Sequence, residues 1–182
     1  MATPLTPPSR GFERSEFEQR TQQLQQRMAA DGVDAVFFST EPEFRYFSGF
    51  KSQFWESPTR PWFLVVPASG RPIAVVPEIG VAGFEQTWIE DVRSWPSPRP
   101  EDDGISLLGD TLAEVARQHR RVGAMLGAET HLRMPAANFS ALQQRLSQHE
   151  MVDVSASVRE IRSVKSAAEV AKIRFACEVT AA

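Results

Sequence analysis

The residues best suited to chemistry lie between Phe50 and Trp62, in the stretch FKSQFWESPTRPW. This stretch combines four aromatic rings with Lys51, Glu56 and Arg60. Aromatic rings supply a large contact area, and a guanidinium offers a planar fork of donors that matches a carboxylate. Because a simple connecting loop is usually small and polar, this composition favours a binding loop. The alternative is a hydrophobic lid over the domain's own sheet.

Other candidate centres have simpler structural explanations. A metal site needs several converging ligands, but His119, His131 and His149 have no ligand-like spacing, so we expect no metal site in this segment. No serine lies in a G-x-S-x-G turn, and Cys177 falls on the apolar side of the last expected helix, which predicts a buried, inert thiol. Gly80 and Gly83 lack the rest of a phosphate-binding fingerprint and indicate a tight helix start. We therefore expect no catalytic residue here.

Composition narrows the class of protein further. The 182 residues carry a net charge of -3, with a pI of about 5.7 and no long run of like charges. This balance argues against nucleic acid or anionic lipid as a partner. No apolar run is long enough for a membrane span. A single cysteine and the absence of a signal-like apolar run near the N-terminus favour the cytoplasm.

The candidate loop must be positioned by an α/β scaffold. A helix with Ser15 and Glu18 in capping-box spacing is expected to end at Gly32, and a strand follows over residues 33–38. Apolar runs at 62–66 and 73–76 predict a hairpin, and 89–95 predicts an edge strand. The remaining expected elements are a short helix at Thr40–Gly49, helices over 78–87, 103–120 and 135–148, and strands over 122–126 and 151–154. This order predicts a three-layer α/β fold with a mixed, mostly parallel sheet flanked by helices.

The end of the chain predicts one more helix. Ser166 and Glu169 have capping-box spacing, and Val170, Ile173 and Cys177 continue an apolar stripe to the final residues. A helix whose apolar face continues without a terminating signal usually has more chain to pack against. We therefore expect an excised domain.

Several landmarks carry a resemblance to a known family. The segment Arg159–Val170 resembles the linker between the two domains of creatinase, prolidase and aminopeptidase P proteins. Arg20, Gly32–Ala35 and Tyr46–Phe50 resemble the family's opening helix, its first strand and its Tyr-x-Ser/Thr-Gly-aromatic turn. The landmarks stand in the family's order and extend over most of the chain.

The resemblance implies a two-domain parent protein. It implies a flexible N-terminus over residues 1–12, a creatinase/prolidase-type N-terminal domain with a ribonuclease H-like motif over 13–157, and a linker with the truncated first catalytic helix over 158–182. The absent C-terminal domain would have the pita-bread fold and hold a dinuclear divalent metal, Mn, Co or Zn. This segment alone would be inactive and would hold no cofactor.

The resemblance also implies a role for the aromatic loop. In creatinase-like relatives the corresponding loop reaches the partner subunit's active site, so Phe54, Trp55 and Arg60 are expected to contact substrate within a homodimer. The substrate of the parent would be an Xaa-Pro dipeptide or a creatine-like amidine. Two other hypotheses stay open: a protein-binding module of a non-catalytic pita-bread relative, and a free-standing domain that binds a small molecule.

Overall fold

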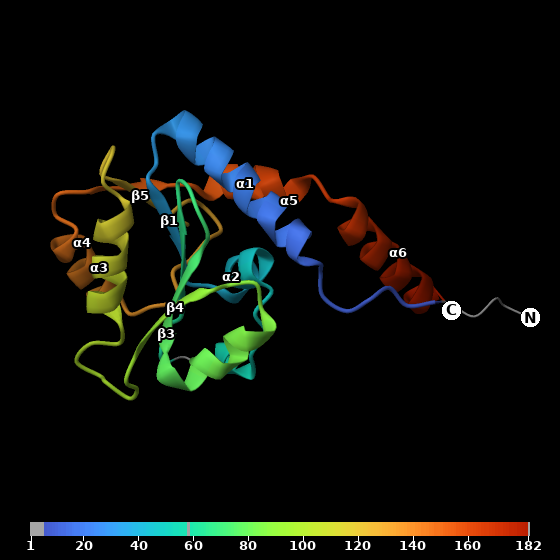
Figure 1. Ribbon diagram of the computed structural model, residues 1–182, viewed down its shortest axis with the longest axis horizontal. Coiled ribbons are helices and arrows are strands. Elements are labelled where there is room, and N and C mark those ends of the chain that lie inside the picture. The colour runs from blue at the N-terminus through green and yellow to red at the C-terminus, as the bar shows by residue number, and fades with distance from the viewer. Residues whose placement is uncertain (1–5, 58, 182) are drawn as a thin grey trace, which may run out of the picture.

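A six-stranded mixed sheet forms the centre of the chain. The computed structural model describes residues 6–57 and 59–181. The strand order is β4-β3-β2-β1-β5-β6, and helices lie on both faces (Figure 1). The strands are β1 (Ala35–Phe38), β2 (Phe63–Pro67), β3 (Ile73–Pro77), β4 (Asp91–Trp95), β5 (Arg121–Ala124) and β6 (Glu150–Asp153). The predicted three-layer α/β fold is confirmed.

The strand directions follow the connections between strands. β2 pairs antiparallel with both β1 and β3, whereas β1 pairs parallel with β5 and β5 with β6. β2 and β3 form the predicted hairpin, since only a short turn separates them. β4 pairs parallel with β3 at one edge of the sheet, as expected for the run at 89–95.

The central strands are buried on both faces because successive residues along each strand are apolar. In β1, Val36 and Phe38 join one core cluster while Ala35 and Phe37 join the other. Successive side chains of a strand point to opposite faces, so this division follows directly from the sequence. Each face therefore needs its own helical cover.

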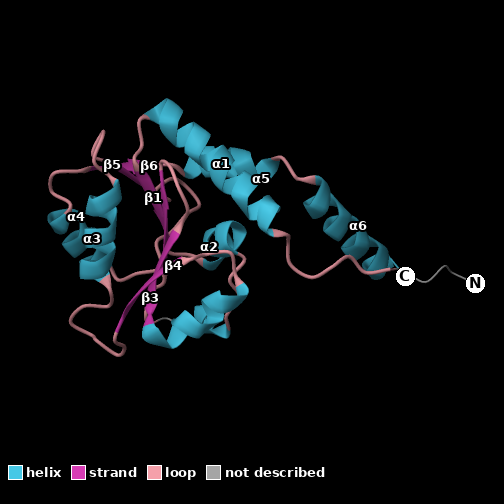
Figure 2. Cartoon of the chain, in the orientation of Figure 1, coloured by secondary structure: helices cyan, strands magenta, loops and turns pink. Residues whose placement is uncertain are grey.

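Different helices cover the two faces (Figure 2). α3 (Ile105–Val115) and α4 (Ala136–Arg145) cover one face and pack against each other. The other face is covered by α1 (Arg14–Asp31), α2 (Glu41–Ser48), α5 (Ser155–Ser163) and two 3-10 helices, η1 (Gln53–Glu56) and η2 (Glu78–Gln86). The aromatic loop lies on this second side.

Some predicted helix ends were wrong. The Ser15–Glu18 capping box does not form, because α1 begins at Arg14 and the Arg14 guanidinium takes the Glu18 carboxylate at 2.7 Å. α3 is shorter than the predicted 103–120. Its backbone leaves the helix at Ala116, and Arg120 adopts a left-handed φ of 54° before β5.

Helix α5 lies where only a linker was expected. Its Val158 is fully buried and its Ile161 nearly so, and both belong to the core beneath α1. The predicted boundary after residue 157 falls inside this helix, and the division into domains stays a prediction.

The last helix stands apart from the sheet. α6 (Ala167–Ala181) projects away from the domain in Figure 1, and none of its described residues is buried. Val170, Ile173 and Val179 are 41%, 50% and 51% exposed. The predicted burial of Cys177 is wrong for this chain, because the thiol lies exposed on this unpacked helix.

Candidate functional site

The aromatic loop folds back onto its own domain. The Trp55 ring centroid lies 5.1 Å from that of Phe44 in α2 and 5.9 Å from that of Trp62. Phe54 stacks on Trp62 at 6.1 Å. Phe54 and Trp55 are half-buried against the core, so part of each side chain stays exposed. This packing fits the hydrophobic-lid alternative and still leaves part of each ring for contact with another molecule.

Two glycines of η2 allow the aromatic cluster to pack closely. A Cβ atom on Gly80 would lie under 3.0 Å from the Trp62 ring, and one on Gly83 would lie 2.7 Å from the Phe50 ring. Neither position has a left-handed φ, so the requirement for glycine here is steric. The two glycines lie inside η2, which begins at Glu78 and not at Gly80 as predicted, and they make room for the rings that flank the loop.

Arg60 has an unusual backbone conformation. Its φ is 59°, in the left-handed region that costs a non-glycine residue about 1 to 2 kcal/mol. Within residues 6–57 and 59–181 no ion pair joins its guanidinium to a carboxylate. Burial raises the pKa of Asp103 above its ordinary value, and the nearby positive charge of Arg60 opposes that rise. The Arg60 side chain is half-buried, and Asp103 is a charged neighbour with which it forms no ion pair.

A residue that sequence reasoning missed holds this loop. Arg133, in the connection between β5 and α4, donates hydrogen bonds to the carbonyl oxygens of Phe54 and Arg60, each at 3.4 Å. Its guanidinium also lies 5.3 Å from the Trp55 ring centroid. No local pattern around Arg133 could have indicated a partner more than 70 positions away.

A hollow of about 510 Å³ opens beside the start of the loop. Its walls include the rings of Phe17, Phe50 and Trp88, and Arg14 and Lys51 contribute positive charge at the rim. Aromatic rings and cationic side chains in one lining favour small molecules that combine an apolar body with an anionic group.

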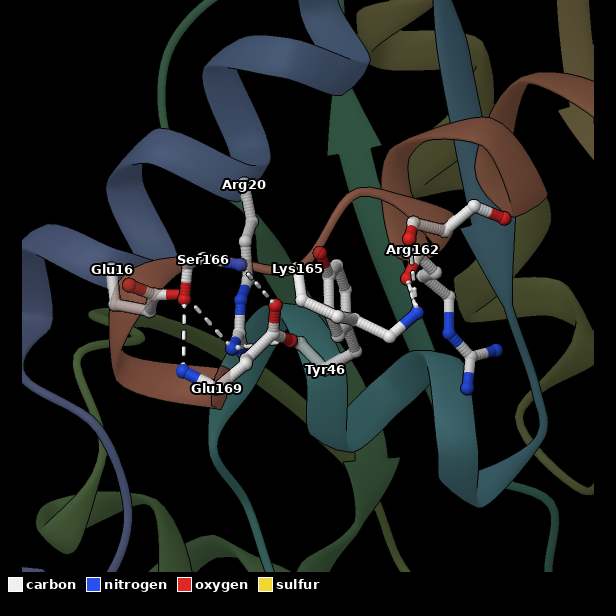
Figure 3. A network of polar contacts seen from close by, with 8 residues as sticks. Glu16, Arg20, Tyr46, Arg162, Lys165, Ser166 and Glu169 are labelled. Carbon is white, nitrogen blue, oxygen red and sulfur yellow. Dashed lines mark hydrogen bonds and ion pairs between the residues drawn. The ribbon is translucent and has the colours of Figure 1, made fainter. Parts of the chain in front are cut away.

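A second cluster joins α1, α2 and α6 around Arg20 (Figure 3). Arg20 is 4% exposed, and its guanidinium donates to the Tyr46 carbonyl oxygen at 2.8 Å. It forms ion pairs with Glu16 at 3.1 Å and with Glu169 at 3.0 Å. The rings of Tyr46 and Phe12 lie 4.1 and 4.3 Å from the guanidinium carbon. A charge this deeply buried is stable only when it is paired and hydrogen-bonded, and here it has both kinds of contact.

Glu169 serves this cluster and its own helix at the same time. Ser166 Oγ accepts from the Glu169 backbone N–H at 3.1 Å, and the Glu169 carboxylate accepts from the Ser166 N–H at 2.9 Å. The predicted Ser166–Glu169 capping box is confirmed. Burial raises the pKa of Tyr46, whose phenol lies beside these charges. The cluster therefore fixes where α6 begins.

The described part of the chain does not supply a metal centre. Across residues 6–57 and 59–181, no three His, Cys, Asp or Glu side chains are grouped closely enough to hold an ion. In the same part of the chain, no helix combines the length and apolar character needed to cross a membrane.

The sequence profile of the creatinase/prolidase N-terminal domain matches residues 20–164. The chain belongs to this family. The creatinase/prolidase match begins at Arg20 in α1 and includes all of α5.

Relatives of this creatinase/prolidase domain are longer proteins. An uncharacterized hydrolase/peptidase of Sinorhizobium fredii is 25% identical over 175 residues, covering 93% of this chain and 43% of the relative. The dipeptidase PepE from Mycobacterium ulcerans superposes with a TM-score of 0.67 at 24% identity, over 88% of this chain and 40% of that one. The prolidase from Pyrococcus horikoshii gives 0.64 at 19% identity, over 89% and 40%. This chain thus spans less than half of these relatives.

Several of the similar solved structures have about the extent of this domain alone, and one is described in these terms. It is the creatinase/prolidase N-terminal domain of an X-Pro dipeptidase from Streptococcus pyogenes, with a TM-score of 0.60 and 18% identity. The match covers 81% of this chain and 99% of that one. At this identity the similarity establishes the fold, and it shows that such a fold exists as an isolated unit.

Proposed function

We propose that this chain is the non-catalytic N-terminal domain of a metal-dependent C–N hydrolase. The observation that carries the proposal is the contrast in coverage. The chain accounts for 40% of a dipeptidase and a prolidase but for 99% of a solved isolated N-terminal domain. The reaction would then belong to a second, C-terminal domain.

The metal belongs to that second domain in this proposal. The described residues here provide no ligand set, so a dinuclear Mn, Co or Zn centre would be held by residues outside them. The contribution of this domain is to bind and to position.

The domain would act within a cytoplasmic homodimer, where its aromatic loop shapes the partner subunit's active site. Arg60 would hold a substrate carboxylate or similar anion, and Phe54 and Trp55 would form the wall beside it. Two observations support this role: the described residues offer Arg60 no ion pair, and both aromatic side chains are partly exposed. A guanidinium flanked by apolar rings is partly desolvated, which strengthens a paired hydrogen bond to a carboxylate. An Xaa-Pro dipeptide or a creatine-like amidine is a substrate of suitable size.

The test is steady-state kinetics and thermal unfolding of Arg60→Ala and Arg60→Lys in the two-domain parent. Loss of a charge-assisted hydrogen bond costs roughly 1.5 to 3 kcal/mol, so kcat/KM for an Xaa-Pro dipeptide or creatine should fall about ten- to a hundredfold. Lysine should not restore activity, because an ammonium cannot form two parallel hydrogen bonds. The melting temperature should stay near wild type.

Two outcomes would contradict the proposal. Unchanged kcat/KM in both variants would remove Arg60 from substrate binding. A large loss of stability in Arg60→Ala, with activity falling in parallel, would make the loop a structural lid.

A further inference from the structure

The backbone around Arg133 is tied to the end of the central strand. The Arg133 N–H donates to the hydroxyl oxygen of Ser39 at 3.1 Å, and Ser39 is buried directly after β1. The position from which the Arg133 side chain extends is therefore fixed by the sheet rather than by the loop.

Several carbonyl groups of the aromatic loop accept hydrogen bonds from the Arg133 guanidinium. It donates to the carbonyl oxygens of Phe54 and Arg60 at 3.4 Å, of Thr59 at 3.3 Å, and of Ser57. The same group lies over the Trp55 ring at 5.3 Å. Across the described residues these acceptors are all main-chain oxygens, and no ion pair joins Arg133 to a carboxylate.

Burying the Arg133 guanidinium costs free energy that its contacts with the loop must offset. Burial lowers the pKa of Arg133, since desolvation disfavours its charge. Arginine nevertheless keeps its proton in proteins, so the converging carbonyl dipoles must offset the burial. The contacts include the carbonyl of Arg60, the loop residue held at a φ of 59°. A strained conformation persists only where surrounding contacts impose it.

We propose that Arg133 is the positioning residue of the aromatic loop: it holds the four main-chain carbonyl groups described above so that the Arg60 side chain is presented to substrate. The presentation of Arg60 to substrate rests on the proposed function. The ordering of the loop rests on the contacts of Arg133 described above. A lysine at position 133 carries one compact ammonium with three donors and cannot span the four carbonyls.

Hydrogen exchange of the 182-residue chain tests the ordering. In Arg133→Ala and Arg133→Lys, we expect amide exchange in residues 53–61 to accelerate at least about tenfold, with exchange in α1 and the central strands unchanged. Arg159→Ala is the matched control, because Arg159 is exposed and donates to a single loop carbonyl, that of Ala128, at 3.0 Å. Unchanged exchange of the loop in Arg133→Ala would overturn the proposal.

A double-mutant cycle in the two-domain parent tests the presentation of Arg60. Arg133→Ala should lower kcat/KM in the same direction as Arg60→Ala, and the double variant should lose little more than Arg60→Ala alone. Losses that multiply would show that Arg133 acts independently of Arg60 and would contradict the inference. If Arg60→Ala leaves kcat/KM unchanged, the proposed function fails, and the exchange measurement alone decides the role of Arg133.

Discussion

Arg20 and Glu169 form an ion pair at 3.0 Å although 149 positions separate them in the sequence. Each belongs to a landmark that resembles the creatinase and prolidase proteins, one in the opening helix and the other in the linker. Their contact joins the first helix of the domain to α6, none of whose described residues is buried. The two landmarks therefore form one structural feature.

Replacing Arg20 should destabilise the chain strongly. Arg20→Ala would leave Glu16 and Glu169 without their counter-charge, and their side chains are only 13% and 14% exposed. Removing one partner of a buried pair costs about 3 kcal/mol, which we expect as the loss in free energy of unfolding by urea denaturation. Glu169→Gln should cost about 1 kcal/mol, since its amide oxygen can still cap α6.

The control for this experiment is Arg174→Ala. Arg174 is exposed on α6, the helix that carries Glu169. A surface substitution of this kind should stay within about 0.5 kcal/mol of wild type. If Arg20→Ala were as mild as Arg174→Ala, the Arg20 cluster would not stabilise the junction.

Two glycines offer a matched comparison of steric demand. Gly80→Ala should lower the free energy of unfolding by about 1 to 3 kcal/mol, because the added Cβ would collide with the Trp62 ring in a full core. Gly109→Ala in α3 should lower the free energy of unfolding much less. The nearest atoms to its added Cβ belong to the flexible side chain of Arg145, and alanine favours the helix by roughly 1 kcal/mol. Equal effects of the two substitutions on urea denaturation would show that the aromatic cluster is more loosely packed than described.

Asp153 should contribute a pH-dependent part of the stability. Burial raises the pKa of this carboxyl, but hydrogen bonds from Ser155 and from the Leu126 and Gly127 backbone outweigh it and hold the pKa below its usual value. A carboxyl with a depressed folded-state pKa stabilises the protein above its unfolded pKa of about 3.9 and loses that contribution as pH falls through the folded value.

Asp153→Asn removes this titration while it keeps a similar shape. The stability difference between wild type and the variant should be constant from pH 5 to 7 and shrink below about pH 4. Urea denaturation across this range measures it. A difference that does not change with pH would mean that the charge of Asp153 does not stabilise the fold.

The sheet could be predicted because its signals are local. Val36 and Phe38 alternate with Ala35 and Phe37, so both faces of β1 had to be buried. The short turn before Ile73 limited β2 and β3 to a hairpin. Periodic apolar residues predicted most of the remaining strands and helices in their chain order.

The contacts that organise the candidate site could not be predicted in the same way. The role of Arg133 could not be predicted because its acceptors are main-chain carbonyls, which every residue carries whatever its type. Helix α5 was taken for part of a linker because the segment Arg159–Val170 resembles the family's linker, although Val158 and Ile161 are buried in the core. Ser15 and Glu18 had the right spacing for a cap, but Arg14 competed for the carboxylate.

The most direct measurement of the central claim is the activity of mixed dimers of the two-domain parent. One subunit carries Arg60→Ala with an intact catalytic domain, and the other carries an intact loop with its catalytic domain inactivated. If the loop acts in the partner's active site, the first subunit's catalytic domain receives an intact Arg60, and one fully active site per mixed dimer is expected. If the loop acts only within its own subunit, mixed dimers will hydrolyse an Xaa-Pro dipeptide or creatine no faster than Arg60→Ala homodimers, and the account will be contradicted.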